Sequence, residues 1–212
     1  MLAQKIQPTE VFDTFWNFAV KRQGLFFKRI EQPEADKWID DPILAKHKFT
    51  NAYRASDRVS QYLIRNVIYS GDSSPEEVFF RIILFKLFNK IETWELLSEQ
   101  LEGISWKEYN FNKYDALLSS VLKHRGTIYS AAYIMASGRT AFGYERKHQN
   151  HLGLIEKMMN SYLPDRIYQA PSMEAVFHLL KAEPSIGNFL AYQYAIDINY
   201  SELTNFSEND FV

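Results

Sequence analysis

The chain contains 212 residues, of which 46% are hydrophobic, and this length and apolar content predict one compact domain with a sizeable buried core. Because it contains no cysteine, disulfide bonds, thiolate catalysis and cysteine-ligated metal centres are excluded. The formal net charge of −2 gives no overall attraction to phosphates, so any nucleic-acid binding must come from a local cationic patch.

The N-terminal part of the chain predicts helices separated by prolines. A hydrophobic period of 3.6 residues runs from residue 9 to residue 30, with Thr9 as the expected cap. Pro33 and Pro42 then disfavour helix in the residues before them, and Asp41 is placed to cap a helix that follows Pro42. We expect one or two helices from there to Tyr69.

The clearest helix start lies in "SGDSSPEE", where Ser74 is the expected cap and Pro75 falls in the first turn. The helix that follows, "EEVFFRIILFKLFNK", is apolar nearly all round, which predicts a central position. Further helices are expected at residues 92–102, 113–136, 147–162, 172–182 and 187–199. Strand signals are weak, so the predicted fold is all-α. We expect a single domain, 1–212, with two lobes at about 1–70 plus 172–212 and 71–171.

Residues 48–69, "KFTNAYRASDRVSQYLIRNVIY", carry an unusual number of flat hydrogen-bonding groups for a helix with buried positions. In a helix that begins near Thr50, polar side chains at intervals of three or four residues share one face and its shoulder. These positions are Asn51, Arg54, Arg58, Gln61 and Arg65. Guanidinium and amide groups suit phosphates and base edges, which indicates a DNA-binding face.

Other residues extend this expected face. Tyr53 flanks it and could stack on an unpaired base, while Arg22 and Gln23 add further polar groups from the first helix. The alternative is a salt-bridge network in which Asp57 and Asp40 or Asp41 accept the arginines. The residue types alone leave both interpretations open.

Residues 178–198, "HLLKAEPSIGNFLAYQYAIDI", predict two helices joined by a tight hairpin around Pro184. Such a hairpin leaves the amide groups of Ser185, Gly187 and Asn188 facing outward, where they could hold a DNA phosphate. The alternative is an ordinary connection between two helices.

The hairpin "LLKAEPSIGNFLA" resembles that of the helix-hairpin-helix DNA glycosylase superfamily, although Ser185 replaces the first glycine of the pattern. This resemblance implies an all-α, glycosylase-like helical domain and a catalytic aspartate downstream of the hairpin. Asp210 and Asp197 are the candidates in this sequence. Asn188 and Phe189 stand where bifunctional members carry a lysine nucleophile, so no lyase activity is expected.

Three stretches, "FWNFAVKRQGLFFKR", "DDPILAKHKFTNAYRASDRVSQYLIRNVIY" and "AIDINYSE…ENDFV", resemble the helical domain associated with 5-hydroxymethyldeoxyuridine DNA kinases. That family is implicated in making hypermodified thymines in phage DNA. Its members continue into a Gly-Pro-Gly stretch, so the C-terminus at Val212 is expected to be truncated. No phosphate-binding Gly-x-x-x-x-Gly-Lys-Ser/Thr loop is present, and a self-contained kinase is therefore not expected.

Together these features predict a DNA-binding protein of thymine hypermodification that recognises or modifies an extruded 5-hydroxymethyluracil. The extruded base would meet Tyr53 or Trp16, and Asp210 would stabilise positive charge at the sugar or activate a nucleophile. Whether the chain is an enzyme stays open. One alternative is a DNA glycosylase that removes the modified base, and another is a non-catalytic helical adaptor for a P-loop kinase or transferase subunit.

Two weaker candidates complete the sequence interpretation. His148 and His151 have a spacing that metal ligands use, with Glu145 nearby, but histidines in a polar stretch seldom bind metal, and we expect no metal and no cofactor. Residues 137–147, "SGRTAFGYERK", predict a flexible loop that could contact a DNA backbone through Arg139, Arg146 and Lys147, and the alternative is a plain basic loop. The chain lacks a signal peptide and an apolar run of about 18 residues, so we expect a cytoplasmic protein without a membrane contact.

Overall fold

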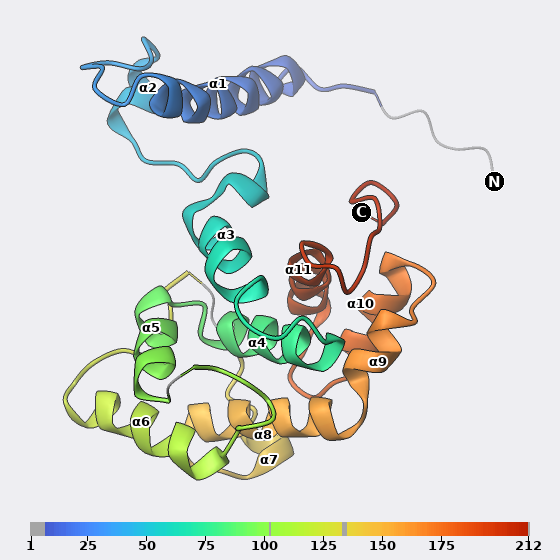
Figure 1. Ribbon diagram of the computed structural model, residues 1–212. Helices are drawn as coiled ribbons and strands as arrows, with labels where there is room; N and C mark the ends of the chain where they lie inside the picture. Colours follow the sequence, from blue (N-terminus) through green and yellow to red (C-terminus); the bar gives the residue numbers. More distant parts are fainter. Residues whose placement is uncertain (1–6, 102, 133–134, 212) are drawn as a thin grey trace. The chain divides into compact units, whose positions relative to one another are not determined.

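The computed structural model describes residues 7–101, 103–132 and 135–211, and every regular element in these ranges is a helix (Figure 1). The all-α prediction is therefore confirmed. The chain divides into two compact units, residues 1–60 and 61–212. The structure describes each unit by itself, and the expected grouping of residues 1–70 with 172–212 stays a prediction.

The first unit consists of α1 (Phe12–Glu31), α2 (Pro42–Lys46) and a 3₁₀ helix, η1 (Arg54–Ser56). The expected cap at Thr9 is wrong, because α1 begins at Phe12 and its N-cap residue, Val11, makes no side-chain capping bond. The expected cap at Asp41 is confirmed: its Oδ1 accepts hydrogen bonds from the amides of Ile43 (3.0 Å) and Leu44 (3.2 Å).

Few side chains of the first unit are buried. Helix α1 has no buried residue, and Leu44 is the buried hydrophobic residue among the described positions of residues 7–60. The predicted apolar stripe of α1 is thus only partly covered: Phe18, Ala19, Leu25 and Phe26 are half-buried, whereas Val11 and Phe15 are exposed.

The second unit contains the core. Its elements are α3 (Arg58–Tyr62, which begins just before it), the π-helical η2 (Leu63–Ile68), α4 (Pro75–Phe88), α5 (Ile91–Gln100), α6 (Phe111–Lys123), α7 (Arg139–Phe142), α8 (Lys147–Asn160), α9 (Leu163–Tyr168), α10 (Met173–Lys181) and α11 (Asn188–Asn199). Every residue of α4 from Glu77 to Phe88 is buried, and η2, α5, α8, α9 and α11 pack around it (Figure 1). The predicted central position of this helix is confirmed.

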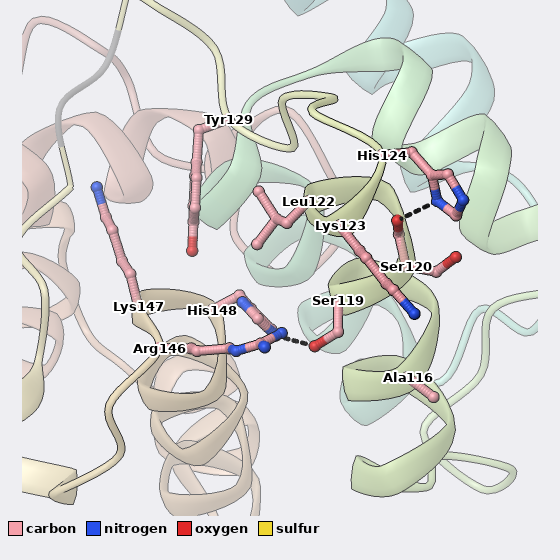
Figure 2. Close-up of a pocket in the computed structure, with 10 residues that line it drawn as sticks. All are labelled: Ala116, Ser119, Ser120, Leu122, Lys123, His124, Tyr129, Arg146, Lys147 and His148. Carbon is pink, nitrogen blue, oxygen red and sulfur yellow. Dashed lines mark hydrogen bonds between the residues drawn. The ribbon is translucent and has the colours of Figure 1, made fainter.

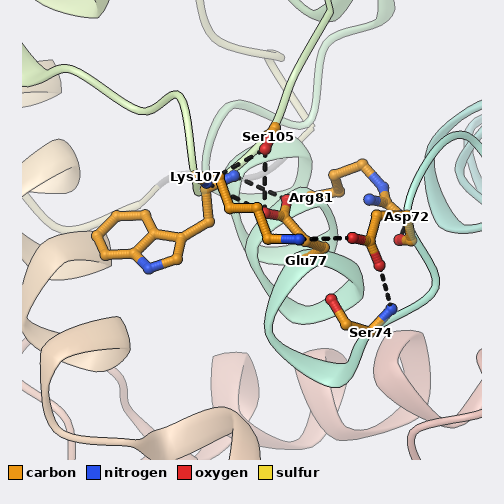
Figure 3. Close-up of polar contacts among 7 residues, drawn as sticks. Asp72, Ser74, Glu77, Arg81, Ser105 and Lys107 are labelled. Carbon is orange, nitrogen blue, oxygen red and sulfur yellow. Dashed lines mark hydrogen bonds and ion pairs between the residues drawn. The ribbon is translucent and has the colours of Figure 1, made fainter.

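Two charged side chains of α4 are buried because backbone groups satisfy them (Figure 3). The Glu77 carboxylate accepts hydrogen bonds from the amides of Trp106 (2.8 Å) and Lys107 (3.1 Å). Arg81 donates to the carbonyl oxygens of Val67 (2.9 Å), Ile68 (3.0 Å) and Asp72 (2.8 Å). These bonds fix the end of η2 with the loop after it, and the segment before α6, to the central helix.

The predicted helix at 113–136 is too long. Helix α6 ends at Lys123, where His124 is the C-cap residue and Arg125 has a left-handed φ of 59°. A Cβ on the following Gly126 would lie 2.7 Å from the Val121 side chain, so this turn needs glycine. Short α7 and α9 were not predicted, because four and six residues carry too little periodicity.

Candidate functional site

The segment at residues 48–69 is not one helix, and this part of the sequence interpretation is wrong. Asn51 precedes η1, and the chain then breaks at Asp57, whose backbone is extended (φ −69°, ψ 148°). The Asp57 side chain accepts a hydrogen bond from the amide of Val59 (3.1 Å) and so starts a new helix. The five polar positions therefore do not follow a single helical period.

Three predicted DNA-binding side chains hold the first unit together. Arg22 donates to the carbonyl oxygen of Thr50 (3.0 Å from Nε), and Gln23 accepts from the amide of Tyr53 (3.0 Å). Asn51 donates to the carbonyl oxygen of Ser56 (2.6 Å). These bonds tie α1 to the loop that precedes α3, which is a structural role.

The expected acids take other partners. Asp40 pairs with Lys37 at 2.8 Å, and Asp41 pairs with Lys21 at 2.9 Å. The Arg22 guanidinium instead lies 5.1 Å from the centre of the Phe18 ring. The salt-bridge alternative therefore does not account for Arg22.

The remaining predicted side chains of this segment differ in exposure. Tyr53, Arg58 and Arg65 are exposed, whereas Arg54 and Gln61 are half-buried. Arg58 belongs to the first unit and Arg65 to the second. Convergence of these groups around one nucleotide stays a prediction.

A short turn joins α10 and α11, and its likeness to the helix-hairpin-helix turn stays a prediction. Ser185 has a left-handed φ of 65°, at the position where the resembling hairpins carry glycine. Gly187, by contrast, has a φ of −86°, and a Cβ there would meet nothing within 4 Å. Gly187 and Asn188 are exposed at the start of the 12-residue helix α11. Within the same turn Ser185 is half-buried, and the amide of Ile186 donates to the carbonyl oxygen of Glu183 (3.2 Å).

The two candidate catalytic acids lie in different environments. Asp197 is fully buried (0% exposed), and its carboxylate is 3.3 Å from Nζ of Lys86, which is also buried. Contact with a substrate would require the core to open, so burial disfavours a catalytic role for Asp197. Asp210 is exposed in the turn near the C-terminus, where its amide donates to the carbonyl of Ser207 (3.1 Å).

A basic pocket of about 760 Å³ lies between the C-terminal half of α6 and the start of α8 (Figure 2). It is lined by Ala116, Ser119, Ser120, Leu122, Lys123, His124, Tyr129, Arg146, Lys147 and His148. The sequence had indicated Arg146 and Lys147 as DNA-backbone contacts, but Lys123, His124 and Tyr129 were missed. No local pattern reveals that the end of α6 lies beside the start of α8.

His148 and His151 have protein partners rather than a shared metal position. Nε2 of His148 is 2.7 Å from Oδ1 of Asp115. In His151, Nδ1 is 2.8 Å from the Tyr129 hydroxyl and Nε2 is 2.8 Å from the Ala136 carbonyl oxygen. In the ranges that the structure describes, no three histidine or acidic side chains are grouped to hold a metal ion.

Burial sets the charge of these groups. It lowers the pKa of His148 and lowers that of His151 to about 4, so both rings are neutral at pH 7. Although burial by itself raises the pKa of Asp115, hydrogen bonds from Gln149, His148 and Ser119 outweigh it and hold the carboxylate charged.

None of the helices in the described ranges is both long and apolar enough to cross a membrane.

The family described as "5-hmdU DNA kinase, helical domain" matches residues 9–212. The 5-hmdU DNA kinase of Bacillus phage SP10 is 25% identical over 198 residues, which cover 89% of this chain and 31% of the relative. The chain thus spans less than a third of that relative's length. No solved structure matches the chain. Since the family match includes both the segment at 48–69 and the hairpin, the chain belongs to the family of 5-hmdU DNA kinase helical domains.

Proposed function

We propose that this chain is a DNA-binding protein of thymine hypermodification that recognises or modifies 5-hydroxymethyluracil extruded from the duplex. The observation that carries the proposal is the family match over residues 9–212. The related phage protein is named a 5-hmdU DNA kinase, and a substrate of that kind is a modified base within DNA. An enzyme must take such a base out of the stack to reach it.

The hairpin supports a contact with the DNA backbone. Ser185 adopts a left-handed conformation, and the exposed first turn of α11 presents backbone amides next to it. Amides at a helix N-terminus bind phosphate because the helix dipole favours negative charge there. In this proposal Ser185, Gly187 and Asn188 hold one phosphate, as in the helix-hairpin-helix glycosylases that the sequence resembles.

Exposed groups supply candidates for the base and the chemistry. Tyr53 (52% exposed) and Trp16 (53%) offer ring faces for an unpaired base, and Arg58 offers a phosphate contact. Asp210 is the acid available to stabilise charge at the sugar or to activate a nucleophile. Hydrolysis of the glycosidic bond and transfer to the 5-substituent are the two reactions that the proposal leaves open.

Binding measurements test the proposal. Duplexes with one thymine, one 5-hydroxymethyluracil or one pyrophosphorylated 5-hydroxymethyluracil are titrated with the chain at several salt concentrations. We expect salt-dependent binding that favours a modified base. Negligible, salt-insensitive binding to all three duplexes would overturn the proposal. Mass analysis of nucleosides after incubation separates the reactions, since release of a free base identifies a glycosylase.

The second candidate function is a non-catalytic adaptor, and the exposed side of α1 favours it. Its large exposed apolar side chains include Phe12, Phe15, Trp16, Val20, Phe27 and Ile30. Exposed apolar surface of this kind marks protein interaction sites. Co-purification with a P-loop kinase or transferase subunit, together with no DNA binding by the chain alone, would select this function over the first.

A further inference from the structure

The basic pocket between α6 and α8 concentrates unpaired positive charge. Lys123, Arg146 and Lys147 line it, and no aspartate or glutamate does. None of these three cations forms an ion pair within residues 7–101, 103–132 and 135–211. Because the whole chain has a formal charge of −2, this is a local excess rather than a general property of the surface.

The nearest acids offset only part of the positive charge of the pocket. Asp115 lies beside it, but its two carboxylate oxygens accept from His148 (2.7 Å) and Gln149 (3.0 Å). Glu145 is exposed and precedes Arg146 in the sequence. Asp115 is thus held by side chains of α8 and forms no ion pair with Lys123, Arg146 or Lys147, so its charge offsets only part of the positive charge at the pocket.

The pocket wall is held in place before any ligand arrives. The Tyr129 ring stacks on Phe88 (centroids 5.1 Å apart, 25° between planes), and its hydroxyl is 2.8 Å from Nδ1 of His151. Lys147 Nζ lies 4.6 Å from the centre of the same ring (Figure 2). Because Phe88 covers one face of the Tyr129 ring, Lys147 lies over the other, and the ring holds this ammonium group in place at the pocket, where it can meet a phosphate.

The start of α8 adds to this field. Arg146 is the N-cap residue of this 14-residue helix, and its side chain makes no capping bond. The helix dipole therefore favours negative charge at the pocket. Burial also lowers the pKa of Lys147, which means that its ammonium group lies partly out of water and gains from an anionic partner.

We infer that the pocket lined by Lys123, Tyr129, Arg146 and Lys147 binds a phosphate ester, either in a DNA strand or in a free nucleotide. For the DNA source the inference rests on the proposed function. For a free nucleotide the inference does not depend on the proposed function, because the positive charge and the Tyr129 ring form the site whether or not the chain binds DNA.

Neutral substitutions test the inference. Lys123→Gln and Lys147→Gln, singly and together, are compared with Lys113→Gln, which removes the same charge from an exposed position elsewhere on α6. Labelled single-stranded and duplex oligonucleotides are titrated, and thymidine monophosphate and inorganic phosphate are tested for their effect on melting temperature at constant ionic strength.

For the DNA source, we expect each pocket substitution to weaken oligonucleotide binding about tenfold and to reduce the slope of log K against log salt by about one, while Lys113→Gln changes neither. For the nucleotide source, we expect thymidine monophosphate to raise the melting temperature of the wild type and Lys113→Gln but not of the double variant. Lys147→Arg keeps the charge and is expected to retain binding.

The outcomes separate this inference from the proposed function. If the wild type binds DNA, the double variant binds it equally well, and neither small phosphate stabilises the wild type, the pocket assignment is overturned while the proposed function stands. If the wild type binds no DNA but pocket-dependent stabilisation by the nucleotide persists, the proposed function fails and the pocket assignment stands. Unliganded melting temperatures show that each variant is folded.

Discussion

The three buried charged side chains of α4 are matched to specific partners, and these matches explain why the residues are tolerated in the core. Arg81 bonds three carbonyl oxygens, Glu77 bonds two amides, and Lys86 lies against Asp197. A buried charge without such partners would cost several kcal/mol. The sequence showed charged residues in an apolar helix but not the loops that satisfy them.

Replacing Arg81 by Met tests this matching. The substitution keeps an unbranched side chain but removes the donor to three carbonyl oxygens. Val67 keeps a second donor, the Ser70 hydroxyl (3.0 Å), whereas the buried Ile68 carbonyl loses its Arg81 bond, so we expect a loss of about 3–5 kcal/mol in the free energy of unfolding. Urea denaturation measures it, with Arg65→Met, at an exposed position, as the matched control. A similar small effect of both substitutions would contradict the role of Arg81.

His151 predicts acid sensitivity. Nε2 faces a carbonyl oxygen and carries the proton, while Nδ1 faces the Tyr129 hydroxyl as an acceptor, so the neutral ring is satisfied on both sides. Because burial lowers its pKa to about 4, the unfolded chain binds the proton more readily than the folded chain. Stability from this group is complete above about pH 6.5 and is lost as the pH falls toward 4, by about 3 kcal/mol in all.

Urea denaturation at pH 7.0 and pH 5.0 measures this dependence. His151→Gln can donate to Ala136 and accept from Tyr129 without titrating, so we expect a smaller difference between the two pH values in this variant. His148, whose pKa burial also lowers, contributes in the same direction and is left intact in both proteins. An unchanged difference would assign the acid sensitivity to other groups.

Arg58 tests the DNA-binding face that the sequence indicated. It is exposed at the start of α3, so we expect Arg58→Ala to weaken DNA binding and reduce the salt slope by about one without lowering the melting temperature. A large loss of melting temperature with unchanged DNA binding would instead make Arg58 a structural residue.

At the scale of elements, helix starts were predicted better than helix ends. The start after Asp41 is set by residues that are adjacent in the sequence, and the start of α4 at Pro75 likewise follows from its local residues. The cap at Asp57 and the glycine turn after Lys123 are also local, but a hydrophobic period alone does not reveal them. The predicted DNA-binding face failed as one helical stripe for this reason.

The hairpin gives a prediction at this scale. Ser185 has a left-handed φ, which β-branched residues rarely adopt, so we expect Ser185→Val to destabilise the protein by about 1–2 kcal/mol while Ser185→Gly is tolerated. Chemical denaturation of both variants measures the difference. Equal stabilities would mean that the turn does not hold this conformation in solution.

At the scale of the whole molecule, the core is unevenly distributed. The buried hydrophobic residues lie in the second unit apart from Leu44. A unit that buries so little apolar surface cannot offset the conformational entropy of ordering its chain. The second unit, with α4 enclosed by other helices, can.

Expression of the parts tests this difference. We expect residues 57–212, which keep the Asp57 cap of α3, to unfold cooperatively in urea with helical circular dichroism. We expect residues 1–60 alone to show little cooperative unfolding. Cooperative unfolding of the isolated N-terminal part would contradict this account of where the stability lies.

The sequence by itself determined the all-α fold, the central helix and the family, because each depends on local periodicity, on capping residues or on long stretches of likeness. Tertiary structure decided that Asp197 is enclosed with Lys86, that Arg22, Gln23 and Asn51 hold a loop, and that Lys123 meets Lys147 at one pocket. The physical reason is the distance along the chain over which each effect acts. Helical propensity and capping act over a few residues, whereas burial and the gathering of charge depend on which helices pack together.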